Sequence, residues 1–382
     1  MIVGTAEASV VKMKKVGIVG IGNVGKRASF LLKREGYDII LLDSDEEKLK
    51  SFSKEINSAY KKVDVLDKNS LSSLGNLDLV VTSLPGSIAH DAVKNFVSLG
   101  FNVADVSFFP EDPIDINDIA TENNVTVILD AGVAPGLSNM LISYGKYKLG
   151  NLTGGRIYVG GITEKPDPPL GLVITWNAMD LIDEYRRHAR LINNKKIVTF
   201  DPLSSEIGKI YVNGLGELEY FPTDGLRSLL KTYSDLDFLA EYTLRWPGHV
   251  DFMKGLKKIG LLDHKKIVVK GKEVFADEFF SSLLGQNRYS FKDIVVLIVE
   301  AFYDKKFIRF TQIVKPDSLW SGMSRVTGSF LAYVSMEFLQ NKLKGRGIIY
   351  PENLSEDLLK DIINKMENDG MPIIEEEINK IK

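Results

Sequence analysis

The stretch Gly20-Ile21-Gly22-Asn23-Val24-Gly25 decides the fold, and it directly follows the apolar run Lys15-Val16-Gly17-Ile18-Val19. Each glycine has its own reason to lack a side chain. The first permits a tight strand-to-helix turn, the second lets backbone N–H groups approach a pyrophosphate, and the third lets the helix pack closely on the strand. The free N–H groups and the dipole of the helix N-terminus then favour an anion. The stretch therefore predicts a dinucleotide-binding βαβ unit.

The residues that follow complete this unit and indicate which dinucleotide it binds. A helix is predicted from Val24 to Arg34, and the next predicted strand, Tyr37 to Leu42, ends at Asp43. A carboxylate at this point accepts hydrogen bonds from the ribose hydroxyls. Because the run Asp43-Ser44-Asp45-Glu46-Glu47 is acidic and would repel a 2′-phosphate, we expect NAD rather than NADP. The residues expected to contact the cofactor are Gly20, Gly22, Asn23, Val24, Gly25, Asp43, Ser44, Asp64, Leu84 and Pro85.

The alternation of predicted strands and helices continues after this unit, which is typical of a parallel, doubly wound sheet in an α/β protein, a Rossmann domain. The further strands are predicted at Lys62–Val65, Leu77–Thr82, Phe101–Val106 and Val125–Leu129, the last of the set. Ligands of such sheets lie at the carboxyl ends of the strands. We therefore expect Asp64 beside the adenine, and the nicotinamide half at the loop Ser83-Leu84-Pro85-Gly86.

The pattern changes at about Asn151, where short strands separated by Pro, Gly and Asp begin. This predicts a second, α+β domain with an antiparallel sheet that carries helices on one side. One of these helices is expected from Met179 to Leu191. The predicted parts are a disordered leader at 1–12, the NAD-binding domain at 13–137, the substrate and dimerisation domain at 138–318, a helix returning to the nucleotide domain within 319–350 and a helical tail at 351–382.

Polar side chains end two neighbouring strands of the first domain. Asp105 and Ser107 follow one strand, and Asp130 follows the next. Because ligands of an open α/β sheet lie at this edge, the carboxylates are candidates to receive a substrate ammonium or its proton, and Ser107 to hydrogen-bond the substrate. The alternative is that each aspartate caps the turn after its strand.

The second domain supplies candidates for binding the substrate. A planar guanidinium grips a carboxylate with two hydrogen bonds, so Arg245 and Arg227 are candidate anchors for an amino acid. His249 is a candidate acid or base, or else a loop residue held by hydrogen bonds. The alternatives are structural ion pairs for the arginines and a core position for Trp176. Arg325 opens a long amphipathic helix that is expected to bring it to the interdomain cleft.

The composition argues against several classes of protein. The 382 residues carry 48 basic and 51 acidic side chains and no cysteine. Because the charge is balanced, the sequence shows no excess of basic residues that would bind nucleic acid or an acidic membrane. No stretch approaches the roughly 18 apolar residues of a membrane span. Thiolate metal sites and disulfides are excluded, and we expect no metal in the site. A cytoplasmic protein with a small-molecule substrate is the expectation.

Several segments spread along the chain together resemble one enzyme family. They are the glycine stretch, Ser83-Leu84-Pro85-Gly86, Asp105-Val106-Ser107-Phe108, Asp130-Ala131-Gly132-Val133-Ala134-Pro135-Gly136, Asp224-Gly225-Leu226-Arg227-Ser228, Thr243-Leu244-Arg245-Trp246-Pro247-Gly248-His249, Ser324-Arg325-Val326-Thr327-Gly328 and Gly347-Ile348-Ile349-Tyr350-Pro351-Glu352. This set resembles the saccharopine dehydrogenase-like family, and within it the lysine 6-dehydrogenases. The likeness runs from Met13 to Glu352.

The resemblance implies an NAD-dependent amine dehydrogenase that oxidises the ε-amino group of L-lysine. The products would be ammonia and 2-aminoadipate 6-semialdehyde, which cyclises. It also implies a homodimer, with Asp105, Ser107 and Asp130 at the reacting end and Arg245 and Arg227 at the distal carboxylate. Two alternatives stay open: a saccharopine or carboxynorspermidine-type enzyme acting on a secondary amine, and an NAD-binding sensor without turnover.

Overall fold

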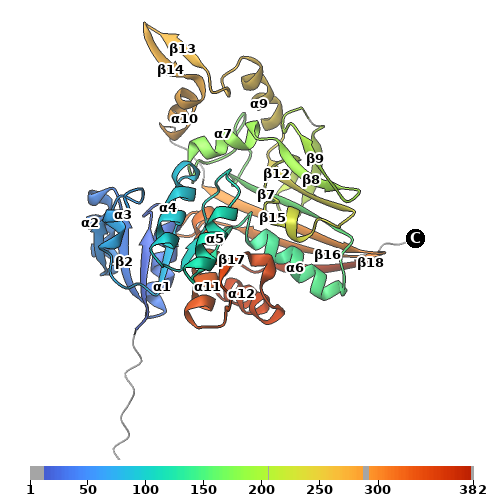
Figure 1. Ribbon diagram of the computed structural model, residues 1–382. Helices are drawn as coiled ribbons and strands as arrows, with labels where there is room; N and C mark the ends of the chain where they lie inside the picture. The colour runs from blue at the N-terminus through green and yellow to red at the C-terminus, as the bar shows by residue number, and fades with distance from the viewer. Residues whose placement is uncertain (1–12, 205, 287–291, 380–382) are drawn as a thin grey trace, which may run out of the picture.

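The described chain forms two large sheets, with helices between and around them, and a small two-stranded sheet (Figure 1). The structure, a computed structural model, describes residues 13–204, 206–286 and 292–379. The predicted leader at 1–12 lies outside the described residues. Within the described chain, no helix is long and apolar enough to cross a membrane.

The first sheet is parallel throughout, as the sequence predicts. In spatial order its strands are β17 (Gly347–Ile349), β6 (Thr126–Ile128), β5 (Val103–Asp105), β4 (Leu79–Thr82), β1 (Lys15–Val19), β2 (Asp38–Asp43) and β3 (Ala59–Lys62). Strand β1 pairs with both β2 and β4, so the chain leaves it in opposite directions and a crevice opens at the carboxyl ends of these strands. This crevice is where the sequence places the cofactor.

Helices cover both faces of the first sheet, and apolar residues fill the space between. The helices are α1 (Asn23–Arg34), α2 (Glu46–Ile56), α3 (Lys68–Ser72), α4 (Gly86–Ser98) and α5 (Ile114–Glu122). Helix α1 confirms the prediction made from the glycine stretch. The predicted strand Lys62–Val65 is wrong in position, because Ala59–Lys62 pairs with β2 and only the Val63 N–H continues the ladder, donating to the Asp43 carbonyl.

The second sheet is antiparallel except where β12 runs parallel to β7. Its path is β10 (Gly208–Val212), β11 (Gly216–Pro222), β12 (Phe238–Arg245), β7 (Gly154–Thr163), β15 (Asp293–Tyr303), β16 (Lys306–Val314) and β18 (Ile374–Asn379), and β8 (Ala189–Asn193) pairs with β12 and with β9 (Lys196–Phe200). A separate hairpin of β13 (Lys266–Val269) and β14 (Lys272–Phe275) projects from the top (Figure 1). The two-domain α/β plus α+β architecture is confirmed.

The second domain carries further helices: α6 (Leu137–Leu149), α7 (Ala178–Arg186), α8 (Leu229–Thr232), α9 (His249–Lys258), α10 (Ala276–Gln286), α11 (Gly322–Leu339) and α12 (Glu356–Asn368). Helices α6 and α11 pack on β15 and β16. The predicted helix Met179–Leu191 is too long, because Arg187 at the C-cap is already extended (φ −68°, ψ 127°) and the chain enters β8. This early end turns the Arg187 side chain away from the path of the helix.

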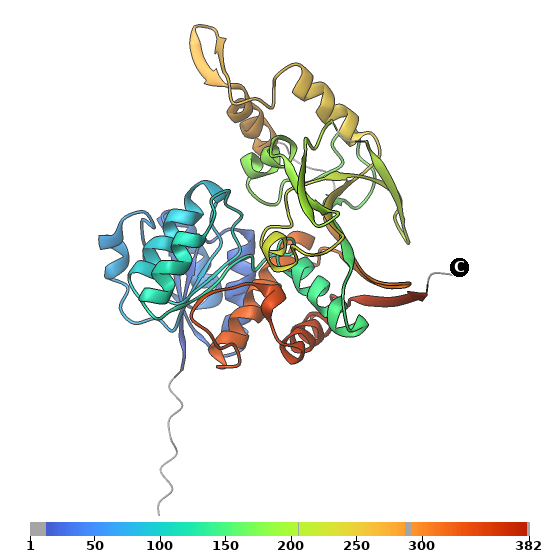
Figure 2. The same ribbon diagram turned by 45° about the vertical axis from the view of Figure 1, so that its right-hand side comes forward.

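The last part of the chain returns to both domains. As predicted, α11 packs against α1, and Figures 1 and 2 show α11 and α12 beside the first domain and beneath the second sheet. Two expectations are corrected. Strand β17 lies beyond β6, so Val125–Leu129 does not form the last strand, and the tail contains β18 as well as α12. Strand β18 pairs with β16, which places Glu376 opposite Arg309, and Glu375 forms an ion pair with Lys148 of α6.

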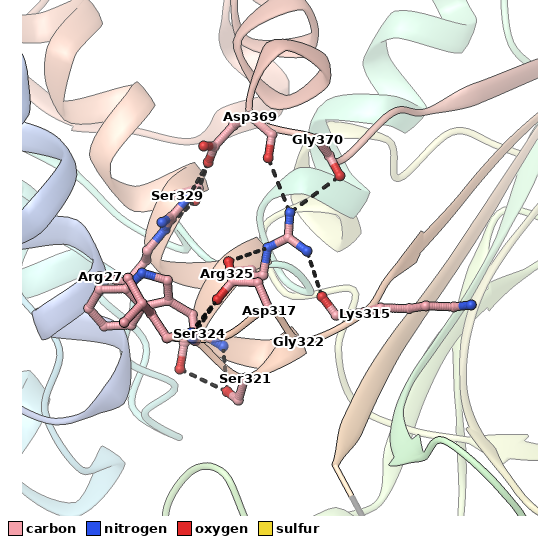
Figure 3. Close-up of polar contacts among 12 residues, drawn as sticks. Arg27, Lys315, Asp317, Ser321, Gly322, Ser324, Arg325, Ser329, Asp369 and Gly370 are labelled. Carbon is pink, nitrogen blue, oxygen red and sulfur yellow. Dashed lines mark hydrogen bonds and ion pairs between the residues drawn. The ribbon is translucent and has the colours of Figure 1, made fainter.

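A polar cluster holds this returning segment in place (Figure 3). The buried Arg27 on α1 pairs with Asp369, and its Nε donates to Ser329 Oγ at 3.0 Å. Arg325, predicted to reach the substrate, instead donates to the backbone carbonyls of Lys315 (2.6 Å), Asp369 (3.2 Å) and Gly370 (3.3 Å). Arg325 therefore fastens the end of α12 to α11 and does not line the interdomain cavity.

Replacing Arg27 tests this cluster. Arg27→Met leaves the Asp369 carboxylate largely buried without its main cation, so we expect the free energy of unfolding to fall by about 3 kcal/mol. Arg34 is the matched control, because its half-exposed guanidinium lies 3.9 Å from the same carboxylate and Arg34→Met should cost less than about 1 kcal/mol. Urea unfolding monitored by circular dichroism measures both, and equal losses would contradict the assignment.

Candidate active site

A cavity of about 810 Å³ lies between the two domains. On one side it is lined by the loops at the carboxyl edge of the first sheet, and on the other by α7, the turn before α8 and the end of β12. Asn23 joins the two walls, because its Nδ2 donates to the Thr175 carbonyl at 3.2 Å. The crevice predicted from strand order is therefore part of a larger cavity between the two domains.

The glycine stretch forms the dinucleotide end of the cavity. A Cβ on Gly20 would lie 2.3 Å from the Ser83 carbonyl oxygen, and one on Gly25 would lie 2.0 Å from the Gly20 carbonyl oxygen. A Cβ on Gly22 would meet nothing within 4 Å, and Gly22 lines the cavity. Helix α1 begins there without a side-chain cap, so its first N–H groups are left for an anion. These residues fit a pyrophosphate.

Asp43 lies at the rim where the adenosine ribose is expected. Its Oδ2 accepts from the Ile21 N–H at 2.7 Å and its Oδ1 from the Asp45 N–H at 3.0 Å. Ser44 and Asp64 line the same end of the cavity, as predicted. Lys48 also lines it, and this cation was not predicted because it is one of several charged residues on an exposed helix face.

Ser107 connects two loops at the other end of the cofactor region. Its hydroxyl donates to Asp105 Oδ1 at 2.8 Å and accepts from the Leu84 N–H at 3.0 Å. Leu84, Pro85 and Ser107 line the cavity, whereas Asp105 is fully buried beneath them. Burial raises the pKa of Asp105 to about 7, against the opposing effect of hydrogen bonds from Thr82 and Ser107. Asp105 thus orients Ser107 and does not face the cavity.

Asp130 and Arg227, both predicted to face the substrate, are instead close to each other. Arg227 Nε lies 3.7 Å from Asp130 Oδ1, and its Nη1 donates to the Phe109 carbonyl at 2.6 Å. Neither residue is part of the cavity lining. Burial raises the pKa of Asp130, while the Arg227 guanidinium opposes that rise. The pair therefore joins the turn after β6 to the second domain behind the cavity wall.

His249 takes the structural alternative that the sequence left open. Its Nε2 lies 2.8 Å from the Tyr185 hydroxyl and its Nδ1 lies 2.6 Å from the Leu170 carbonyl, so Nδ1 is the donor. Burial, followed by the nearby Arg245 cation, lowers the pKa of His249 to about 3. The imidazole is therefore neutral and lies outside the cavity lining.

Arg245 and Trp176 do line the cavity, as predicted. The Arg245 guanidinium is 1% exposed, and its Nη2 donates to Glu184 Oε2 at 2.8 Å while its Nε donates to the Tyr185 hydroxyl at 3.2 Å. Trp176 lies against Gly161, where an added Cβ would approach its ring to 3.4 Å. Arg245 is thus already paired with a carboxylate of the cavity wall.

Three cavity residues were missed by the sequence analysis. Arg187 lies with its guanidinium 4.4 Å from the centre of the Phe108 ring, and no carboxylate of the described chain is within ion-pair distance of it. Asp180 Oδ2 accepts from the Gly86 N–H at 3.4 Å, beside the Leu84-Pro85 loop, and burial raises its pKa to about 6. Asp180 lies in the first turn of α7 and Arg187 directly follows its last residue, and the sequence of this helix carries no motif.

Glu241 is the third missed residue, and it is buried in the cavity wall. It is 5% exposed, its Oε1 accepts from Thr223 Oγ1 at 3.3 Å, and its Oε2 has no hydrogen-bond partner within the described residues. Burial, followed by the negative charge of Glu184, raises the pKa of Glu241 to about 8. At neutral pH Glu241 is therefore largely protonated.

Known proteins share both halves of this architecture. Residues 16–128 match the model of the saccharopine dehydrogenase NADP binding domain, and residues 132–371 match that of the saccharopine dehydrogenase C-terminal domain. The two domains and the cradle between them define an oxidoreductase with a nicotinamide cofactor. The chain belongs to the saccharopine dehydrogenase family.

Individual relatives are distant in sequence. The mitochondrial alpha-aminoadipic semialdehyde synthase of Rattus norvegicus is 24% identical over 272 residues, which are 66% of this chain and 29% of that protein. The Mus musculus enzyme is 25% identical over 271 residues, with the same coverage. The chain thus spans less than a third of these relatives. The apo saccharopine dehydrogenase (L-Glu forming) of Saccharomyces cerevisiae shares the fold, with a TM-score of 0.78 and 18% identity over 96% of this chain and 100% of that one.

The raised pKa of Glu241 predicts a pH-dependent stability. The pKa of this group rises from 4.5 to about 8 on folding, so between these values the folded state holds a proton that the unfolded state releases. The free energy of unfolding should therefore fall by on the order of 3–5 kcal/mol through this group as pH rises from 4.5 to 8. Glu241→Gln should remove that part of the decline. Urea unfolding of apoprotein at pH 5 and pH 8 measures it, and equal declines in both proteins would contradict the assignment.

Proposed function

We propose that this protein catalyses the NAD-dependent oxidative deamination of the ε-amino group of L-lysine, giving ammonia and 2-aminoadipate 6-semialdehyde. The observation that carries the proposal is the charge of the substrate half of the cavity. Its lining contains five carboxyl groups and two guanidinium groups: Asp180, Asp183, Glu184, Asp224 and Glu241, against Arg187 and Arg245. An excess of acidic groups favours a substrate with more amino groups than carboxylates. Lysine has two amino groups and one carboxylate.

Three of the five carboxyl groups already have a cationic partner within the protein. Asp183 is paired with Arg186, Glu184 with Arg245, and Asp224 with Arg190. Of the two guanidinium groups that line the cavity, only Arg187 lacks a carboxylate partner among the described residues. One free guanidinium suits one substrate carboxylate. Saccharopine, the alternative, carries three carboxylates and would have to compete with Glu184 for Arg245.

The residues near the Leu84-Pro85 loop suit the reacting end. The bound nicotinamide would accept the hydride that leaves the ε-carbon with its bonding electrons. The amine must first be neutral, so that its lone pair can form the C=N bond as the C–H bond breaks. Asp180 lies beside this loop, where its Oδ2 accepts from the Gly86 N–H, and its pKa of about 6 leaves it ionised at neutral and alkaline pH, so it can take the ammonium proton. Ser107, held by Asp105, is a hydrogen-bonding partner for the reacting groups.

Hydrolysis of the imine completes the balance. Water adds to the C=N carbon, a proton moves to nitrogen, and ammonia leaves as the aldehyde forms. The α-amino and α-carboxylate groups are unchanged in this sequence. The mammalian relatives are named for alpha-aminoadipic semialdehyde, which is the product of the proposed reaction. A homodimer and a cytoplasmic location are further parts of the proposal. The homodimer rests on the family resemblance, and the location rests on the composition of the chain, which has no cysteine.

Preference for NAD rests on Asp43. Its carboxylate lines the cavity where the adenosine ribose is expected, and the acidic residues that follow it would repel a 2′-phosphate. Lys48 is the one cation of the described lining at this end, and its charge opposes this effect in part. The matched family model carries NADP in its description, so the preference needs a direct measurement.

The decisive experiment is reduction of the cofactor at alkaline pH, followed at 340 nm with L-lysine, saccharopine or carboxynorspermidine as the only amine. We expect reduction with lysine, one ammonia released per NADH formed, and a higher kcat/KM for NAD than for NADP. Turnover of secondary amines alone would assign the saccharopine-type alternative. Tight NADH binding with no turnover of any amine would assign the sensor.

Arg187→Met tests the carboxylate anchor. Loss of a charge-assisted pair should raise the KM for lysine about 10- to 100-fold and leave the KM for NAD within about twofold. Cadaverine, which is lysine without its carboxylate, should be used equally well by the variant and the parent. Arg186→Met is the matched control, because Arg186 is paired with Asp183 and Asp277 and lies outside the cavity lining. An unchanged KM for lysine in Arg187→Met would remove Arg187 from the site.

A further inference from the structure

Glu241 differs from several other buried carboxyl groups of the substrate domain, because one of its two oxygens has no hydrogen-bond partner among the described residues. Glu300 is paired with Arg309, Glu219 accepts from the Gly248 and Val250 N–H groups, and Asp277 is paired with Arg186. Glu241 Oε2 has no partner within the described residues, although the side chain is only 5% exposed and lines the cavity. A buried polar atom without a partner is costly, so the partner is expected to come from the cavity.

The chain leaves room for this carboxyl group at one specific position. A Cβ on Gly225 would lie 1.8 Å from Glu241 Oε1 and 1.9 Å from Oε2. The Glu241 carboxyl group therefore lies directly against the backbone of Gly225. Gly225 belongs to the turn that also contains Thr223 and Asp224. A side chain at residue 225 would displace the carboxyl group. The location of Glu241 is consequently fixed by two segments, β12 and the turn before α8.

The surroundings of Glu241 select a cation. Glu184 and Asp224 both add negative charge and raise its pKa together with burial. The hydroxyls of Thr223 and Thr243, which are 3.0 Å apart, line the cavity beside it. An ammonium group has three donors and matches a carboxylate with neighbouring hydroxyl acceptors. No group of three or more metal-ligating His, Asp or Glu side chains occurs in the described chain, so the acceptors suit an amine rather than a metal ion.

We propose that Glu241 recognises a second, unreactive amino group of the substrate and so makes this enzyme selective for diamino acids. The inference rests on the proposed lysine oxidation, in which the ε-amine reacts and the α-amine does not. Glu241 and Arg187 then hold the two charged groups of the α-carbon, while Asp180 and Ser107 face the ε-amine. Glu241 is a specificity determinant in this arrangement and takes no part in the oxidation itself.

The test compares L-lysine with 6-aminohexanoate, which has the same chain, carboxylate and reacting amine but no α-amino group. The enzyme should prefer lysine in kcat/KM by at least about 30-fold, because losing one partner of a buried charge pair costs about 2 kcal/mol or more. The variant Glu241→Gln keeps the size of the side chain. Its kcat/KM for lysine should be about 30-fold lower than that of the parent, because KM rises while kcat is unchanged. The value for 6-aminohexanoate should stay within about threefold.

Two further variants separate recognition from damage to the fold. Gly225→Ala keeps the Glu241 carboxyl group but displaces it. This variant should lower the ratio of kcat/KM for lysine to kcat/KM for 6-aminohexanoate. Glu300→Gln is the matched control, because it changes a buried carboxyl group of the same sheet outside the cavity, and the preference should be unchanged. Circular dichroism and NADH binding establish that each variant is folded. Equal losses for lysine and 6-aminohexanoate in both cavity variants would overturn the proposal, as would a parent enzyme without preference.

A binding measurement distinguishes failure of this inference from failure of the proposed reaction. Calorimetric titration of the enzyme–NADH complex with lysine and with 6-aminohexanoate requires no turnover. Tighter binding of lysine that depends on Glu241, without lysine oxidation, would support the inference and reject the reaction. Lysine oxidation with no dependence of the preference on Glu241 would support the reaction and reject the inference.

Discussion

The contact between α1 and α11 positions the whole site. Helix α1 begins at the glycine stretch, and one turn later Arg27 is buried against Ser329 and Asp369 of the returning C-terminal segment. The helices approach closely because residue 328 is glycine: a Cβ there would lie 2.7 Å from the Arg27 Cβ and 2.8 Å from the Val24 carbonyl oxygen. Helix α11 also contributes Met323 and Thr327 to the cavity. One packing contact therefore sets the cofactor cradle and part of the opposite wall together.

Charge pairing determines what the rest of the cavity can bind. Most ionisable groups of the wall are already matched within the protein, and matched pairs attract a ligand weakly. Among the described residues, the groups of the substrate half without an ion-pair partner are Arg187, Asp180 and Glu241, a cation and two carboxyl groups. Their combination is complementary to one carboxylate and two amines. Residues that the motifs pointed to, such as Arg245, hold the wall in shape, because their charges are satisfied by neighbouring side chains.

The sequence predicted the parts of the site that depend on local backbone geometry. The glycine stretch, Asp43 and the Leu84-Pro85 loop occupy the expected ends of parallel strands because strand direction alone brings them together. It failed for Asp130, Arg227 and Arg325, whose side chains have partners far away in the chain. A motif identifies residue types, but the choice between a ligand and a protein partner is made by tertiary packing.

The missed residues had no local pattern that could reveal them. Helix α7 ends at Arg186 without a glycine or proline, so nothing in the sequence indicates that Arg187 turns into the cavity. Glu241 stands between apolar residues in the strand β12, as polar residues of many half-buried strands do. Its position depends on Gly225, which lies sixteen positions earlier in the chain. Strand β18 was missed for a similar reason, because its three consecutive glutamates do not alternate with apolar residues, and its pairing with β16 joins parts of the chain that are far apart in the sequence.

The two ends of the cavity have different consequences for turnover. In the proposed reaction the product keeps the α-amino and α-carboxylate groups, so Glu241 and Arg187 bind substrate and product through the same contacts. Such uniform binding lowers KM without favouring the transition state. Discrimination between lysine and its product then depends on the reacting end, where Asp180 loses its cationic partner as the ε-amine becomes an aldehyde. In this proposal the two carboxyl groups have different roles: Glu241 selects the substrate, and Asp180 responds to the change in charge that the reaction produces.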